Sequence, residues 1–236
     1  MRRLALILST AAAVIATPAI ARDGQTYFGI EGGVVLPNDI QFDVTGGAGG
    51  QTVLDNDNGW EAGVVIGHDF GFIRLEAEGA YKDFNVQSVT SNTTPIPLAT
   101  AAGGTGSFGD ISGGIDVISG MVNALIDIGG NNGIGFSAGG GVGYAIFDAN
   151  LSADPAGPGI VDDKDKGFAY QGIAQLRMPL TDSVDVGLKY KYFVIPNLDL
   201  ASTQNLGYSD DFESHSVLAT LSFNFGGSRA APPPPP

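Results

Sequence analysis

The sequence has no cysteine and few residues of several other kinds, and each shortage excludes a class of protein. Without cysteine, the 236-residue chain has no disulfide, thiolate metal site or thiol nucleophile. Only 11 residues are basic against 25 acidic ones, and the net charge of −14 argues against nucleic acid as a partner. Beyond residue 21, no apolar run reaches the roughly 18 residues that a membrane-spanning helix needs. Any membrane contact must therefore be made by strands.

The first 21 residues have the three parts of a secretory signal peptide. Arg2 and Arg3 are basic, residues 4–15 are mostly apolar, and Ala19-Ile20-Ala21 provides the small residues of a cleavage site. We therefore expect a signal peptide over residues 1–21, cleaved near Ala21, and a single domain over residues 22–225.

Eight segments of alternating apolar and polar residues follow, and this period of two is typical of strands. They cover residues 25–36, 59–69, 72–84, 115–128, 134–147, 167–179, 184–195 and 213–225. Long connections over residues 37–58, 85–114, 148–166 and 196–212 alternate with tight turns near residues 70–71, 129–133 and 180–183. Outer-membrane barrels show this asymmetry. The pattern predicts an all-β fold: an eight-stranded antiparallel up-and-down transmembrane β-barrel with short periplasmic turns and long extracellular loops.

The two faces of these segments differ in polarity. In segment 72–84, Ile73, Leu75 and Ala77 alternate with charged residues. Aromatic residues gather at the segment ends, as in the interfacial girdles of membrane barrels. We place Tyr27, Phe28, Phe70, Phe72, Phe136, Phe223 and Phe225 at the periplasmic end, and Trp60, Tyr81, Phe84, Phe147, Phe168, Tyr170 and Tyr192 at the outer end. A soluble barrel or sandwich would show the same alternation with its sides exchanged, but the loops and the aromatic ends favour a membrane.

Three stretches carry a family resemblance: residues 27–33, 71–78 and 217–225. They resemble the OmpA-type outer-membrane barrels and the porin-like surface antigens of similar size, over residues 25–225. The resemblance implies a location in the bacterial outer membrane, and it implies that Phe223 and Phe225 form the signal read by the barrel-assembly machinery. The partners it implies are outer-membrane lipid, lipopolysaccharide, that machinery, and proteins of the periplasm or the cell exterior.

Residues 226–236 end in five prolines and are expected to form a stiff periplasmic tail. This tail resembles the proline-rich hinge that joins OmpA-type barrels to a peptidoglycan-binding domain. The residues of such a domain are absent from this sequence, so peptidoglycan binding is not carried over.

Charged residues on the inward face form the main candidate site. They are Glu31, Glu61, Arg74, Glu76, Glu78, Lys82, Asp127, Arg177, Asp185, Lys189 and Lys191. An eight-stranded barrel has an interior just wide enough for side chains. Because the two signs nearly balance, we expect paired charges that plug the interior of a protein with a structural and surface-interaction role. The alternative is a small porin-like diffusion pore gated by Arg74, Glu76, Glu78, Lys189 and Lys191.

The expected turns predict specific neighbours inside the barrel. Folding the chain about Thr181 sets Arg177 opposite Asp185, where opposite charges attract. The preceding turn sets Asp127 opposite Gly135 and Asn123 opposite Gly139, so glycines make room for polar side chains. The Gly-rich run 139–143 opens no helix, which argues against a phosphate-binding loop.

Nothing in the sequence indicates an enzyme, a cofactor or a metal site. His68 and His215 fall at opposite ends of the expected barrel. A lipid-modifying enzyme would need a group such as His215 with Ser214, Ser216 and Glu213, but adjacent strand residues face opposite sides. Acidic residues of the long loops are expected to be solvated rather than to bind calcium; they are Asp39, Asp43, Asp55, Asp57, Asp154, Asp162, Asp163 and Asp165. The segment 92–106 is expected to be a mobile loop suited to surface contacts.

Overall fold

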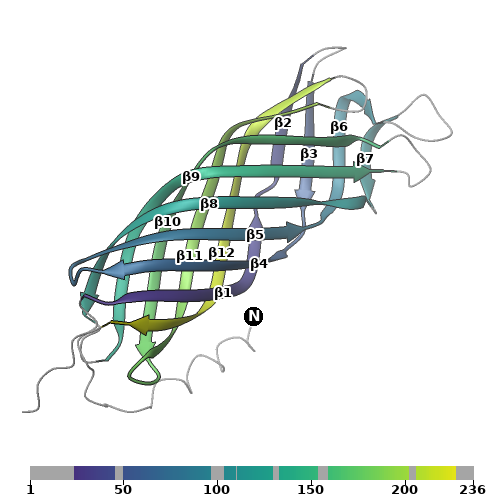
Figure 1. Cartoon of the computed structure of the whole chain (residues 1–236). Helices are drawn as coiled ribbons and strands as arrows, with labels where there is room; N and C mark the ends of the chain where they lie inside the picture. Colours follow the sequence, from purple (N-terminus) through teal and green to yellow (C-terminus); the bar gives the residue numbers. More distant parts are fainter. Residues whose placement is uncertain are drawn as a thin grey trace, which may run out of the picture.

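The computed structural model describes residues 24–45, 50–96, 104–109, 111–129, 133–153, 159–201 and 206–226. These residues form one antiparallel sheet of twelve strands (Figure 1). The strands are β1 (Thr26–Pro37), β2 (Ile40–Thr45), β3 (Gly50–Asn56), β4 (Gly59–Asp69), β5 (Ile73–Phe84), β6 (Val86–Ile96), β7 (Gly104–Gly109), β8 (Ser112–Gly129), β9 (Gly135–Ser152), β10 (Val161–Pro179), β11 (Val184–Ala201) and β12 (Gly207–Phe225). In this part of the chain no helix has the length and apolarity needed to cross a membrane. The expected signal peptide and proline tail lie outside the described residues.

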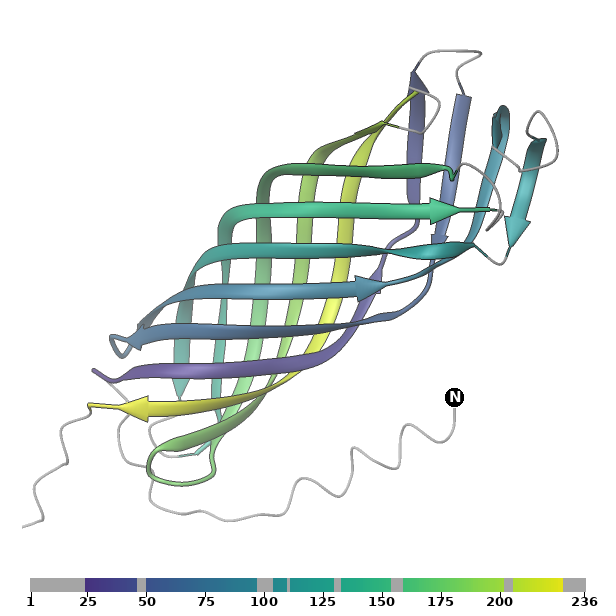
Figure 2. The same cartoon turned by 45° about the vertical axis from the view of Figure 1, so that its right-hand side comes forward.

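Eight of the twelve strands close into a ring. Their order is β1-β4-β5-β8-β9-β10-β11-β12, and β12 also pairs with β1. This closing pair runs from Thr26 opposite Phe225 to Pro37 opposite Ser214 (Figure 2). These eight strands match the eight segments predicted from alternation, except that β1, β5 and β9 each begin one residue later than predicted.

The remaining four strands correct the prediction of eight. The pairs β2 with β3 and β6 with β7 lie within the expected first and second loops, and they extend the sheet beyond the ring in the order β12-β2-β3-β6-β7. Strands β9 to β12 also run into the expected third and fourth loops. The four additional strands were missed because each is short or rich in polar residues: β2 has only 6 residues, and β6 is mostly serine, threonine and asparagine. The centre of the expected mobile loop, residues 97–103, lies outside the described residues.

Side-chain polarity reverses along the molecule. We call the end where β1 begins and β12 ends the lower part, and the end with β2, β3, β6 and β7 the upper part. In the lower part Leu75 is 45% exposed on the outer surface while Glu76 faces inward with 4% exposed. In the upper part Phe42 is buried and Asp43 is exposed. The outside is therefore apolar below and polar above, and the inside is the opposite.

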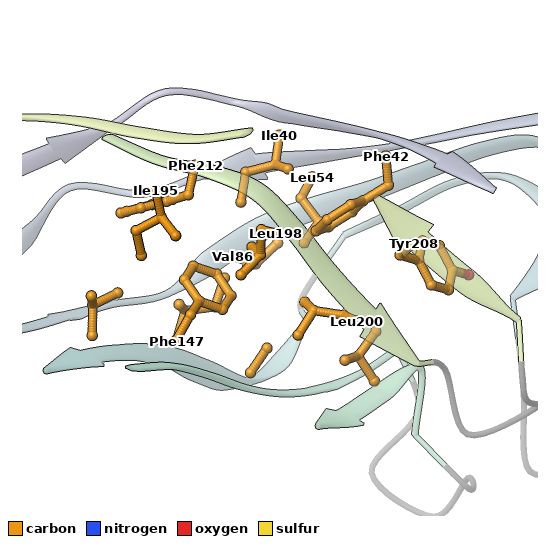
Figure 3. Packing of buried hydrophobic residues seen from close by; sticks show 14 of the residues in the cluster. Ile40, Phe42, Leu54, Val86, Phe147, Ile195, Leu198, Leu200, Tyr208 and Phe212 are labelled. Atoms are coloured by element: carbon orange, nitrogen blue, oxygen red, sulfur yellow. The ribbon is translucent and has the colours of Figure 1, made fainter. Parts of the chain in front are cut away.

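An apolar core fills the upper part (Figure 3). The ring of Phe212 stacks on Phe84 with centroids 5.7 Å apart and meets Phe147 edge-on at 5.1 Å. Burial raises the pKa of the Tyr208 hydroxyl at the edge of this core. These side chains belong to a buried apolar cluster above the charged region.

Several aromatic residues expected in the two interfacial girdles are buried instead: Tyr27 at the periplasmic end, and Phe84 and Phe147 at the outer end. Phe84 and Phe147 belong to the upper core, and Tyr27 is buried in the lower interior with 3% exposed. The prediction placed them by their position at segment ends, whereas strand parity decides which side they face. Val194 shares the strand parity of the exposed Leu188 and Tyr190, yet it is fully buried beside an irregularity in the pairing between Ile195 and Leu198.

The predicted neighbours across two turns were wrong by two residues. Strand pairing sets Arg177 opposite Gly187 and Asp185 opposite Pro179. In the same way it sets Asp127 opposite Ser137, and Asn123 opposite Gly141. Each turn is centred one residue further along the chain than expected, which changes partners but keeps every side chain on its predicted face.

Glycine at position 141 gives the inward Asn123 side chain its space. A Cβ atom added at Gly141 would overlap Asn123 Oδ1 and crowd the carbonyl oxygen of Val122. Asn123 is itself fully buried. The glycine-rich strand β9 therefore has a packing role, and the glycine involved is Gly141 rather than the expected Gly139.

Replacing this glycine is expected to destabilise the fold. Gly141→Ala forces Asn123 out of place and should lower the free energy of unfolding by about 1–3 kcal/mol, the usual range for overpacking. Gly172→Ala is the matched control, because a Cβ there meets nothing within 4 Å. Urea unfolding, with the temperature at which unboiled protein loses its compact gel mobility, measures both. Equal stability of the two variants would contradict this packing.

Candidate functional site: a charged interior

The eleven charged residues expected to face inward are all buried in the structure, each with 7% or less of its surface exposed. Strands β1, β4 and β5 contribute Glu31, Glu61, Arg74, Glu76, Glu78 and Lys82; strands β8, β10 and β11 contribute Asp127, Arg177, Asp185, Lys189 and Lys191. Alternation along each strand places them, because residues two apart point to the same side. Buried apolar side chains share this interior, among them Val65, Ala80, Leu125, Ile173 and Leu218.

Three lysines and three glutamates interlock in what we call the lysine–glutamate cluster. It consists of Glu31, Glu61, Glu78, Lys82, Lys189 and Lys191. Lys191 pairs with Glu61, lies 2.6 Å from Glu78 Oε1 and 3.7 Å from Glu31 Oε1. Lys82 lies 2.6 Å from Glu61 Oε2 and Lys189 lies 2.5 Å from Glu31 Oε2. Because β11 and β5 are four strands apart in either direction around the ring, Lys191 and Glu78 meet across the lumen.

Two arginines and two aspartates form a second group nearer the lower end, the arginine–aspartate cluster. Arg74 Nη2 lies 2.9 Å from Asp69 Oδ2 and 3.2 Å from Asp127 Oδ2. Arg177 pairs with Asp127 and lies 3.5 Å from Asp69 Oδ2. Sequence reasoning missed Asp69, although it shares the inward parity of Glu61 on β4. Asp185 accepts a hydrogen bond from Asn224 Nδ2 at 2.9 Å.

Uncharged polar side chains complete the network. Asn123 Nδ2 donates to Glu78 Oε2 at 3.0 Å, and Gln171 Nε2 donates to Asn123 Oδ1 at 2.8 Å. Tyr27 Oη donates to Glu76 Oε1 at 2.6 Å, with the Arg74 guanidinium 4.7 Å from the centre of its ring. The prediction omitted Tyr27 and Gln171 from the interior, although both have the inward parity of their strands.

The interior holds charges in mutually compensating positions. Glu31, Glu61 and Glu78 bring carboxylate oxygens within 4.8 Å of one another, an arrangement that also occurs at metal sites. Here the ammonium group of Lys191 provides the positive charge among them. Buried charges are tolerated only when they are paired and hydrogen-bonded, so removing one leaves its partners at high cost.

The two histidines lie far apart, as expected. His68 Nδ1 lies 3.0 Å from Thr26 Oγ1, at the start of β1. His215 pairs with Leu36 at the other end of β1, and its Nδ1 lies 2.7 Å from Tyr190 Oη. Its neighbours Ser214 and Ser216 are fully buried on the interior side. They therefore do not converge with His215 into a catalytic group.

Two of the aspartates expected in loops link β10 to β11. They lie beyond the last backbone pair of these two strands, Tyr170 with Val194. Asp165 accepts a hydrogen bond from the backbone N–H of Asp199 at 2.9 Å, and Asp163 accepts one from Ala201 at 2.7 Å. Asp43, Asp55 and Asp162 also lie in strands, and Asp39 and Asp57 are exposed between strands. Asp154 lies outside the described residues.

The proposed assembly signal lies at the end of β12. Phe223 and Phe225 are 36% and 58% exposed on the outer surface of the ring. They pair with Phe28 and Thr26 of β1, so the last residues of β12 close the ring.

Neutralising the centre of the lysine–glutamate cluster should destabilise the protein strongly. Lys191→Met leaves Glu31, Glu61 and Glu78 without their shared cation, and breaking such a buried group costs about 3–5 kcal/mol. Lys164→Met is the control, because Lys164 is exposed and pairs with Asp148 at the surface. We expect urea unfolding to show a large loss for the first variant and no change for the second. A small loss for Lys191→Met would mean that the cluster does not hold the ring together.

Comparison with known proteins identifies the fold. No protein-family model and no curated protein matches the chain. Among solved structures, the outer-membrane protein OprG from Pseudomonas aeruginosa is 16% identical, with a TM-score of 0.57 over 87% of this chain and 98% of OprG. Neisserial surface protein A is 12% identical (TM-score 0.48; 84% and 97% of the two chains), and the outer-membrane protease OmpT from Escherichia coli is 12% identical (TM-score 0.42; 91% and 99%). The likeness to OprG shows that this chain has the fold of an outer-membrane β-barrel protein.

Proposed function

We propose that this chain is an integral protein of the bacterial outer membrane: an eight-stranded barrel with a plugged interior that displays its upper part outside the cell. The observation that carries the proposal is the reversal of polarity along the molecule. Large apolar side chains cover the outside of the lower ring; among them are Phe28, Ile30, Val34, Val64, Ile66, Leu75, Ile118, Val122, Ile126, Val142, Leu188 and Val217. Such a band is stable in lipid and would be a liability in water.

The closed ring supports the membrane assignment. In a bilayer every backbone N–H and C=O group must be bonded within the protein, and a closed sheet achieves this because it has no edge. Exposed aromatic residues border the apolar band. Trp60, Phe168 and Tyr170 lie toward the upper part, and Phe70 and Phe72 lie at the lower turn. They fit the two interfacial girdles of a membrane barrel.

The contents of the ring support a plug rather than a channel. The lysine–glutamate and arginine–aspartate clusters cross the lumen in the lower part, and the apolar core closes it above. A path for ions would have to break several buried ion pairs and pass the aromatic rings of the core. The proposed role is therefore structural, with contacts made by the outer surface.

The polar outside of the upper part supports a role in surface contacts. Asp39, Asp43, Asp57, Asp199 and Asp211 are exposed there. Its partners in this proposal are lipopolysaccharide, lipid and extracellular or periplasmic proteins, with Phe223 and Phe225 read by the barrel-assembly machinery. That the chain is not an enzyme stays a prediction, and unchanged lipid A in cells that express it is the expected result.

A small cation-selective diffusion pore is the second candidate, favoured by one observation. The described interior holds seven buried carboxylates against five basic side chains, an excess of negative charge that would attract cations. In such a pore Arg74, Glu76, Glu78, Lys189 and Lys191 would line the path.

Conductance across planar lipid bilayers separates the two candidates. We expect purified, folded protein to give no reproducible channels, because the network fills the lumen. If the protein does conduct, and Arg74→Ala or Glu78→Ala changes the ion selectivity while the exposed control Lys164→Ala does not, the lumen is a pore and the plug is wrong.

A further inference from the structure

A small cavity lies between the two charge clusters. It has a volume of about 10 Å³, and Tyr27, Glu31, Glu76, Gln175, Lys189, Thr220 and Ser222 line it together with Gly29, Ile30 and Val65. Such a space is about the size needed for a single water molecule or small ion. Gly29 contributes to it, since a Cβ there would approach Ser222 Oγ to 3.2 Å.

Three buried oxygen atoms of this cavity's lining accept no hydrogen bond within the described protein. They are Glu31 Oε1, Glu76 Oε2 and Gln175 Oε1, from side chains of which no more than 7% is exposed. Lys191 Nζ approaches Glu31 Oε1 only to 3.7 Å. Unsatisfied buried acceptors are rare in native proteins, and three around one cavity indicate a missing ligand with positive character.

The charges around the cavity also indicate a bound cation. Of the two carboxylates that line the cavity, Glu31 has two lysines near it, Lys189 at 2.5 Å from Oε2 and Lys191 at 3.7 Å from Oε1, so the charge that lacks a counter-charge is that of Glu76. Glu76 accepts a hydrogen bond from the neutral Tyr27, and among the described residues no lysine or arginine nitrogen lies within 4.0 Å of a Glu76 oxygen. One negative charge is therefore left without a direct counter-charge in a site shielded from solvent.

A single water molecule could not satisfy all three oxygen atoms, because it has only two hydrogens to donate. It also carries no charge to balance that of Glu76. A magnesium ion carries too much charge for the site and retains several waters, for which the cavity has no room. A sodium ion fits the volume, binds carboxylate and amide oxygens, and balances the remaining charge.

We propose that this cavity is a sodium-binding site, formed by Glu31, Glu76 and Gln175 and assisted by the hydroxyl groups of Thr220 and Ser222. It departs from the expectation that the chain binds no metal ion. The bound sodium ion stabilises the ring by completing the link between the lysine–glutamate cluster and Tyr27. The proposal rests on the filled interior inferred above. A conducting lumen would not by itself remove a sodium-dependent stability, so the two tests can fail separately.

The test compares thermal stability of the full, folded chain in detergent with sodium chloride or with N-methylglucamine chloride at equal ionic strength. We expect the midpoint of thermal unfolding to rise by roughly 5 °C in saturating sodium, since a ligand that binds the folded state alone stabilises it. Equal ionic strength removes the general effect of screening.

Glu76→Gln and Gln175→Leu should each abolish the sodium effect, while Asp185→Asn, an interior change outside the cavity, should retain it. In N-methylglucamine, Glu76→Gln should also be more stable than the unaltered chain, because the uncompensated charge is gone. A gain in stability cannot be explained by a variant that fails to fold. Equal midpoints of the unaltered chain in both salts would overturn the proposal. A sodium effect that persists in both cavity variants would overturn it as well.

Discussion

The pairing of β12 with β1 is the constraint on which the rest of the structure depends. Once the sheet closes, each strand has one face toward a lumen of fixed width and one face outward. Every side chain of these strands therefore points either into the lumen or to the outside. In lipid the outward face must be apolar and the backbone must be fully bonded. The inward-facing side chains then have to fill the lumen.

The inward-facing side chains are mostly charged in the lower part of the molecule and apolar in the upper part. Charges buried in a narrow space are stable only as a connected set, which explains why Lys191 contacts carboxylates from three different strands. Pairs that cross the lumen, such as Lys191 with Glu78, also fix the distance between opposite walls. Where the strands leave the apolar band, the inside becomes a conventional hydrophobic core around Phe212. The reversal between these two regions marks the outer boundary of the membrane in this account.

Alternation in the sequence predicted the faces of the ring strands well, because a period of two leaves only two choices for each side chain. It could not predict the partner across a turn. The positions of Arg177 and Asp185 depend on where the turn is centred, and one residue there moves every pair by two. Residues 40–44 were read as loop because Ile40, Phe42 and Val44 form a very short strand whose apolar side faces inward. Asp69 and Tyr27 could have been found from parity alone, whereas the cavity beside Glu76 depends on packing between distant strands.

The central claim is that the apolar outer surface of the lower ring faces lipid. Trp60 is the single tryptophan of the chain; it is 49% exposed at the upper border of this band and packs beside Tyr81. Its fluorescence in vesicles containing brominated lipids tests the claim directly. The account predicts strong quenching when the bromine atoms lie near the headgroups, and weak quenching by aqueous acrylamide. Free quenching by acrylamide with none by brominated lipid would contradict it.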